Sequence, residues 1–154
     1  MKIALALLCL ASLCGLPAIA QAKAAMPVAG ETVDAFVMAP GLTVIFEPTA
    51  DGQAHIISMS DDPHAPVPRN PGQVAVAMTF NPESGTLLEF NSGLDFDLRY
   101  RADPVKAPDA ILDAAATSLV TCPVMGAAVS SDQWPDNFQV IALSGFGRHQ
   151  GPRC

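Results

Sequence analysis

Four charged residues in the middle of the chain have the spacing of one strand face: Asp95, Asp97, Arg99 and Arg101. Side chains two positions apart on a strand point the same way, so these four would lie side by side. Neighbouring carboxylates can do acid–base work, and arginine is frequent among the residues that dominate protein interfaces. On an exposed face, opposite charges also neutralise each other weakly, at about 0–1 kcal/mol per pair. These residues are therefore the candidate binding residues, and the two arginines are preferred.

Metal and catalytic chemistry have weaker support. His55 and Met59 suit copper, but four residues along a strand span about 13 Å, which is too far for one ion. Asp61, Asp62 and His64 lie close together, without the spacing of a calcium-binding loop. None of the three histidines has a cysteine or serine partner at a telling position. We therefore expect no catalytic residue, no metal site and no cofactor.

The charged residues belong to an unbroken alternation over residues 94–101, which predicts a strand with one buried and one exposed face. The buried face would carry Leu94, Phe96, Leu98 and Tyr100. A second short strand is predicted over residues 86–91. A hairpin joining the two runs would oppose Phe90 to Phe96 and keep one face apolar. The alternative is an arch at residues 91–94 that places the strands in different sheets, and the pattern leaves both open.

Short β-rich runs separated by Gly, Pro, Asn and Asp recur along the rest of the chain. Their spacing of about 8–12 residues is typical of all-β sandwiches. Expected strands cover residues 32–38, 42–46, 54–60, 73–81, 118–125 and 138–144. The pattern predicts an all-β fold, an immunoglobulin-like antiparallel β-sandwich of about seven or eight strands.

Three regions between these runs lack a strand pattern. Residues 61–72 contain four prolines, which cannot donate ladder hydrogen bonds, so a stiff exposed loop is expected there. Residues 126–137, which hold the only tryptophan, Trp134, are also expected to form a loop. One short helix near residues 109–116 is consistent with Pro108 and the alanines that follow it.

The first 22 residues have the form of an export signal. Lys2 precedes an apolar run, Pro17 ends that run, and residues 20–22 match a small-x-small cleavage site. We expect cleavage before Lys23. The product would be a periplasmic or secreted protein with a single domain over residues 23–154.

The charge of that product excludes some partners. Lys2 is one of eight basic residues, so seven remain against 15 acidic ones, and the net charge is near −8. Such a surface repels nucleic acid, which needs a basic footprint. No remaining apolar run approaches the roughly 20 residues that span a bilayer. The sequence therefore predicts a soluble chain that does not bind nucleic acid.

Cys122 and Cys154 are predicted to form a disulfide. Removal of the signal takes Cys9 and Cys14 with it, so these are the two thiols that remain. An exported protein reaches an oxidising compartment, where disulfides persist. The alternatives are two free thiols or a bridge between two chains.

Two stretches resemble known families. The string LEFNSGLDFDLRY, residues 88–100, resembles a strand pair of small exported immunoglobulin-like domains and, more weakly, of proteinase inhibitors of the BsuPI type. Residues 121–124, 134–135 and 143–146 are similar to the C-terminal half of a group of uncharacterised exported bacterial proteins. These resemblances imply an exported immunoglobulin-like β-sandwich, and the second implies no activity.

We interpret the chain as an exported, soluble, non-catalytic binding or structural module, whose partner would be another exported protein. A protease inhibitor acting through the proline-rich loop is the alternative, because proline rigidifies such a loop in advance. A periplasmic metal chaperone or a small hydrolase is a further alternative. Neither the ligand nor the oligomeric state follows from the residues.

Overall fold

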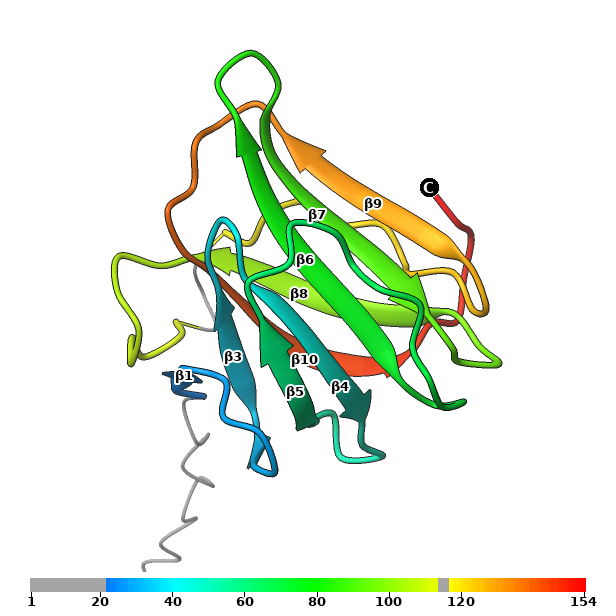
Figure 1. The fold of residues 1–154 in the computed structure, drawn as a ribbon. Coiled ribbons are helices and arrows are strands. Elements are labelled where there is room, and N and C mark those ends of the chain that lie inside the picture. The colour runs from blue at the N-terminus through cyan, green and yellow to red at the C-terminus, as the bar shows by residue number, and fades with distance from the viewer. Residues whose placement is uncertain (1–21, 114–116) are drawn as a thin grey trace, which may run out of the picture.

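The computed structural model describes residues 22–113 and 117–154. Within these ranges the chain is all-β, with ten strands in two sheets and no helix (Figure 1). The strands are β1 Ala24–Ala25, β2 Thr32–Val33, β3 Ala35–Met38, β4 Thr43–Pro48, β5 Ala54–Ser60, β6 Val74–Asn81, β7 Gly85–Ser92, β8 Leu98–Pro104, β9 Val129–Trp134 and β10 Ile141–Arg148. The signal peptide predicted over residues 1–22 lies outside the described residues, apart from Ala22.

One sheet has four strands in the order β1-β3-β10-β8, and the other has six in the order β2-β5-β4-β6-β7-β9. All pairs are antiparallel except β1 with β3. The predicted all-β sandwich is confirmed. The strand count exceeds the prediction for two reasons. The two-residue strand β1 has no sequence signal, and the single strand predicted over residues 32–38 is divided into β2 and β3.

The N-terminal half follows the sequence pattern closely. The strand predicted over residues 54–60 coincides with β5, and β4, β6 and β7 match their predictions to within two residues. The run over residues 32–38 divides at Asp34, where the chain passes from the six-stranded to the four-stranded sheet. The exposed Asp34 carboxylate accepts a hydrogen bond of 2.8 Å from the Gln53 amide at this crossing.

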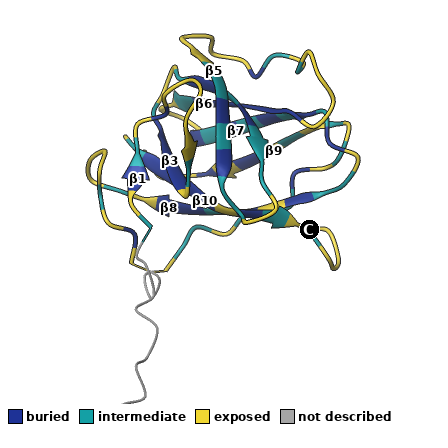
Figure 2. Ribbon diagram, turned by 90° about the horizontal axis from the view of Figure 1, so that it is seen from below, coloured by how far each residue is buried: buried dark blue, intermediate teal, exposed yellow. Residues whose placement is uncertain are grey.

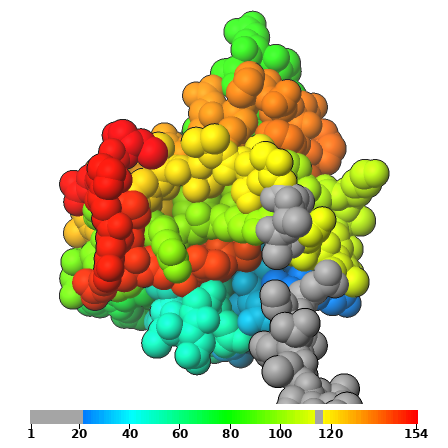
Figure 3. All heavy atoms as spheres, turned by 180° about the vertical axis from the view of Figure 1, so that it is seen from behind, coloured from blue at the N-terminus to red at the C-terminus, as the bar shows by residue number. Residues whose placement is uncertain are grey.

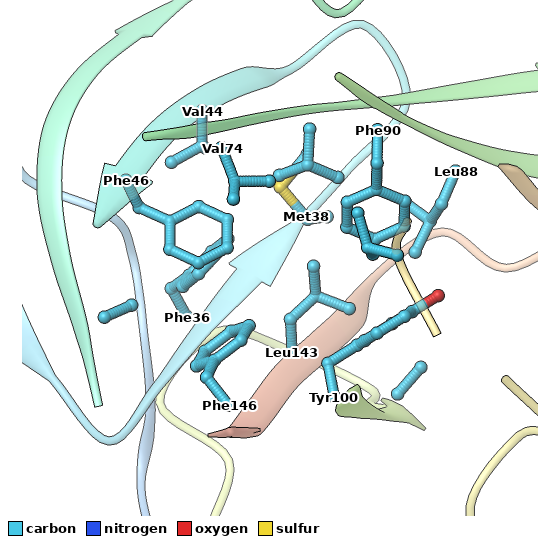
Figure 4. Close-up of a cluster of buried hydrophobic side chains, with 14 of the residues drawn as sticks. Phe36, Met38, Val44, Phe46, Val74, Leu88, Phe90, Tyr100, Leu143 and Phe146 are labelled. Carbon is cyan, nitrogen blue, oxygen red and sulfur yellow. The ribbon is translucent and has the colours of Figure 1, made fainter. Parts of the chain in front are cut away.

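A single large core lies between the two sheets (Figure 4). Phe36, Phe46 and Phe146 bring three strands together, with ring centroids 4.9–5.7 Å apart. Phe90 and Tyr100 meet across the sandwich at 4.9 Å. Full burial of one such side chain stabilises the fold by about 1.5–3 kcal/mol, so these contacts hold the sheets face to face.

The connection between β7 and β8 is an arch between the sheets and not a hairpin, which decides between the two possibilities that the sequence pattern left open. β7 already pairs with β6 on one edge and with β9 on the other, so it has no edge free for β8. β8 pairs with β10 instead and begins only at Leu98. Of the predicted buried face, Leu94, Leu98 and Tyr100 are buried, whereas Phe96 is half-buried.

The C-terminal third departs most from the predictions. Residues 118–125 form no strand and make a single isolated bridge, Val124 with Leu98. The predicted loop over residues 126–137 contains β9, a polar strand that takes its place by pairing with β7. The last strand begins at Ile141, later than predicted, and continues to Arg148.

Residues 117–125, here called the seam segment, run along the edges of β8 and β9. The Leu119 amide donates to the Ala102 carbonyl of β8 at 2.9 Å. The Trp134 indole of β9 donates to the Val120 carbonyl at 2.9 Å. The segment therefore joins the two sheets along one side of the sandwich, and its amides are used there rather than in a regular ladder.

The outer faces of the sheets are partly covered by chain, as the burial pattern in Figure 2 indicates. Segment 105–113 packs on the four-stranded sheet and forms a second small core with its strands β1, β3 and β10: Ala24, Ala35, Val37, Leu112 and Ala142. The helix expected near residues 109–116 is absent from its described part, residues 109–113. Asp109 has a φ of 67° and its amide bonds to the Ala24 carbonyl, so it cannot open a helix. Residues 114–116 lie outside the described residues.

Candidate functional site

The four predicted binding residues do not form one row. Arg99 and Arg101 lie on the outward face of β8, because Leu98 and Tyr100 on the same strand enter the core. Asp95 precedes β8 in the arch and is exposed. Asp97 also precedes β8. The structure therefore divides the predicted group into two arginines on a strand and two carboxylates on the connection that leads into it.

Arg101 has a structural role. Its Nε donates to both oxygens of Asp103, at 2.9 and 2.7 Å, and one terminal nitrogen donates to the Asp113 carbonyl at 3.0 Å. Asp103 is 5 % exposed and also accepts from the Ser118 hydroxyl at 2.8 Å. A buried carboxylate costs several kcal/mol unless it is paired, so Arg101 compensates Asp103 rather than facing a partner.

Asp97 is likewise occupied. It accepts two hydrogen bonds from the Arg153 guanidinium, at 2.6 and 3.0 Å, and one from the Gly126 amide at 3.0 Å. The Arg153 hydrogen bonds, and then the Gly126 amide, lower the pKa of Asp97. The carboxylate therefore stays ionised and holds the end of the chain in place.

Arg99 is one of two predicted residues that line a depression; Asp95 lines another. Together with Arg148, His149 and Gln150, Arg99 surrounds a polar depression of about 540 Å³, here called the arginine hollow. Figure 3 shows the face on which the end of β10 and the C-terminus, in orange and red, lie beside β8. Among the described residues, no carboxylate lies within ion-pair distance of Arg99.

The position of the Arg99 side chain depends on a glycine. Gly147 is the residue of β10 directly opposite Arg99 in the sheet. A Cβ atom at Gly147 would lie 3.1 Å from Nε of Arg99, a tighter distance than most Cβ contacts. The absence of a side chain at Gly147 thus leaves room for the guanidinium beside this residue of β10.

Arg148 is held by an aromatic ring. Its guanidinium carbon lies 4.1 Å from the ring centroid of Phe96, which is close enough for a cation–π contact. Its nearest carboxylate, Asp95, is 4.0 Å away and 91 % exposed, so that pair contributes about 0–1 kcal/mol. Phe96 is half-buried because its ring packs against the core and also supports Arg148.

The C-terminal tail, residues 149–154, provides the rest of the hollow. Its first amide, that of His149, donates to the Asp97 carbonyl at 2.8 Å. Its last residue, Cys154, forms a disulfide with Cys122 of the seam segment, with Cα atoms 5.6 Å apart. The predicted disulfide is confirmed. It fixes the tail at one end while the Asp97 contacts fix it along its length.

A buried polar pair was missed by the sequence reasoning. The Tyr100 hydroxyl of β8 donates to the Asp132 carboxylate of β9, and the Cys122 amide donates to both oxygens of that carboxylate at 3.1 Å. Tyr100 and Asp132 are only 6 % and 8 % exposed. Burial, and then the charge of Asp132, raises the pKa of Tyr100, so the phenol stays protonated. The sequence pattern indicates that Tyr100 faces the core, which implies a buried partner for its hydroxyl. It does not identify Asp132 as that partner, because Asp132 lies in a stretch predicted to be a loop.

The other candidates from the sequence have local partners. A ring nitrogen of His55 lies 3.0 Å from the Thr32 hydroxyl, and Met59 is exposed. The Asp62 carboxylate accepts from the His64 amide at 3.0 Å, as in a local turn. In residues 22–113 and 117–154, no group of three or more His, Cys, Asp or Glu residues could hold a metal ion.

The proline-rich loop, residues 61–72, is mostly exposed as predicted, but it is anchored. Ala65 is 8 % exposed and packs on the outer face of the six-stranded sheet. Its amide donates to the Glu89 carboxylate of β7 at 3.0 Å, and the Thr43 hydroxyl donates to the Asp62 carbonyl. Beyond the anchor, Val67 is 77 % exposed between two prolines.

The described part of the chain contains no helix of the length and apolarity needed to cross a membrane. Comparison of the chain with protein-family models, with curated proteins and with solved structures finds no match.

Proposed function

We propose that the protein is an exported, non-catalytic binding module that binds a negatively charged partner or ligand at the arginine hollow. One observation carries the proposal: in an acidic chain, more than half of the basic residues after residue 22 lie in this region. Seven lysines and arginines follow residue 22, and four of them lie on β8, on the end of β10 and on the tail: Arg99, Arg101, Arg148 and Arg153. Arg101 and Arg153 neutralise carboxylates of the fold, whereas Arg99 has no ion pair among the described residues and Arg148 has one weak, exposed pair with Asp95.

The electrostatics support recognition of an anion at this place. With 15 acidic residues in the chain, most of the surface repels anions, so a local positive hollow directs them to one region. Guanidinium groups bind carboxylate and phosphate oxygens with charge-assisted, often bidentate hydrogen bonds.

Backbone NMR of the isotope-labelled, oxidised protein tests the proposal. We would titrate a panel of small, peptidic and polymeric anions at fixed ionic strength. Saturable shifts of the Arg99, Arg148 and His149 amides are expected for at least one anion. They should disappear in Arg99→Ala/Arg148→Ala and persist in Arg69→Ala, which removes an arginine elsewhere on the surface. Binding by no anion of the panel, or equal binding by the double variant, would contradict the proposal.

A second candidate function is protease inhibition through the proline-rich loop. The anchored Ala65 and the exposed, proline-flanked Val67 favour it, because a loop that is rigid before binding loses little conformational entropy. A protease that accepts small aliphatic side chains, such as elastase, is the test enzyme. Wild type should inhibit it stoichiometrically and Val67→Asp should not. Val129→Asp, which alters an exposed valine on β9, is the matched control.

A further inference from the structure

We propose that the ligand of the arginine hollow is a small organic anion whose terminal carboxylate or phosphate group lies between Arg99 and Arg148. This inference rests on the proposed function and narrows it to one ligand class. The hollow's volume of about 540 Å³ lies within the range of small-molecule sites in proteins. A single terminal group would fill part of it, and the remaining space would take the body of a small molecule.

The lining residues fit such a group chemically. Arg99 and Arg148 each present a planar guanidinium, and Gln150 adds an amide that can donate or accept. A ring nitrogen of His149 lies 3.0 Å from the Pro152 carbonyl, which orients the imidazole within the tail. The donors thus come from two strands and the tail and surround one depression, as recognition of a compact oxyanion requires.

Long polyanions fit the hollow less well. The carboxylates of Asp95 and Asp97 lie next to it, and Asp95 is almost fully exposed. A polymer that extends beyond the hollow would meet these groups and the acidic surface around them. A compact anion avoids that repulsion. It must compete only with Asp95 for Arg148, across a weak pair of 4.0 Å.

Gly147 provides a structural argument for a site of defined shape. The Arg99 guanidinium lies close to Gly147 on the neighbouring strand, and the missing side chain at that position leaves it room. Arg148 in turn is supported by the Phe96 ring. The two arginines are therefore positioned by specific neighbours, whereas a purely solubilising charge needs none.

The test uses sodium phosphate and sodium succinate as probes, with sodium chloride at matched ionic strength as the reference. Amide shifts of Arg99, Gly147, His149 and Gln150 should saturate with at least one of the two probes and show no saturation with chloride. If phosphate alone binds, the terminal group is a phosphate, and if succinate alone binds, it is a carboxylate. Either result supports the inference.

Variants test the geometry. Arg99→Ala/Arg148→Ala should weaken binding about tenfold or more, since each charge-assisted contact is worth at least that factor. Gly147→Ala keeps both arginines but displaces the Arg99 side chain, so it should weaken binding several-fold with a small change in melting temperature. Val129→Ala is the control outside the hollow.

Two results would overturn the inference. Saturable binding of acidic peptides or heparin at these residues, without binding of phosphate or succinate, would refute the small ligand and leave the proposed function standing. Equal binding of the probes to wild type and to the double arginine variant would show that they bind elsewhere, and would refute the site.

Discussion

The C-terminal tail and the proline-rich loop are both irregular segments on the surface, and they are held by different means. The tail is attached by a disulfide to Cys122 and by the Arg153 pair with Asp97. The loop has no cross-link; proline restricts its backbone, and Ala65 anchors it on the sheet. The conformation of the tail therefore depends on oxidation and pH, whereas that of the loop depends on its prolines and on hydrogen bonds with Glu89 and Thr43.

Removal of the disulfide should have the largest effect. In the chain-entropy model, a bridge closing a loop of about 33 residues contributes about 3–4 kcal/mol. Cys122→Ala/Cys154→Ala should lower the free energy of unfolding by about that amount in a denaturant titration. The same variant should speed hydrogen exchange of the His149 amide and leave that of the Ala65 amide close to wild type. Equal acceleration at both amides would mean that the two segments are coupled, and would contradict the conclusion that they are held by separate means.

Tyr100→Phe should have the next largest effect, because it removes the hydrogen bond to Asp132, whose carboxylate also binds the Cys122 amide of the seam segment. After the change, the buried Asp132 carboxylate keeps its hydrogen bonds from the Cys122 amide and loses the one from the hydroxyl. Loss of a hydrogen bond to a buried charged group costs about 1–3 kcal/mol. Thermal melts should show the loss. A double-mutant cycle with Asp132→Asn should show coupling, since a buried amide suffers less from the missing hydroxyl. Independent, additive effects would contradict the assigned contact.

On the loop side, Glu89→Ala should have a smaller effect. It removes the acceptor of the Ala65 amide, at a cost of about 0.5–1.5 kcal/mol. Glu89→Gln, which keeps a carbonyl oxygen in the same place, should stay closer to wild type. Hydrogen exchange of the Ala65 amide reports the change directly. If that amide remains equally protected in Glu89→Ala, the prolines alone hold the loop.

The smallest effect is expected for Asp97→Asn, and it depends on pH. Arg153 lowers the pKa of Asp97 in the folded protein, so the carboxylate stabilises the fold when ionised. This contribution is complete above the unfolded pKa of about 4 and is lost as the pH falls through the lower, folded value. Wild type should therefore melt slightly above Asp97→Asn at neutral pH, and the difference should close in strong acid. A difference that stays constant down to about pH 2 would mean that the pair does not act through the charge of Asp97.

The sequence alone determined much of the N-terminal half and the covalent link. The two-residue period of β6 places Val74, Val76 and Met78 in the core, and the β-rich run over residues 54–60 has the same bounds as β5. These strands were predictable because burial on one face is a local property of the residues themselves. The pairing of Cys122 with Cys154 followed from elimination, since no other thiol remains after residue 22.

Only the tertiary structure decided which strands pair and which charges meet. The alternation over residues 94–101 is the same whether β8 pairs with β7 or with β10. β8 pairs with β10 because both edges of β7 are occupied. β9 is a strand because β7 offers it an edge, although its own residues are mostly polar. Arg99 and Arg148 line one depression because β8 pairs with β10. Local periodicity contains no information on such long-range register, so the hollow could not be read from the sequence.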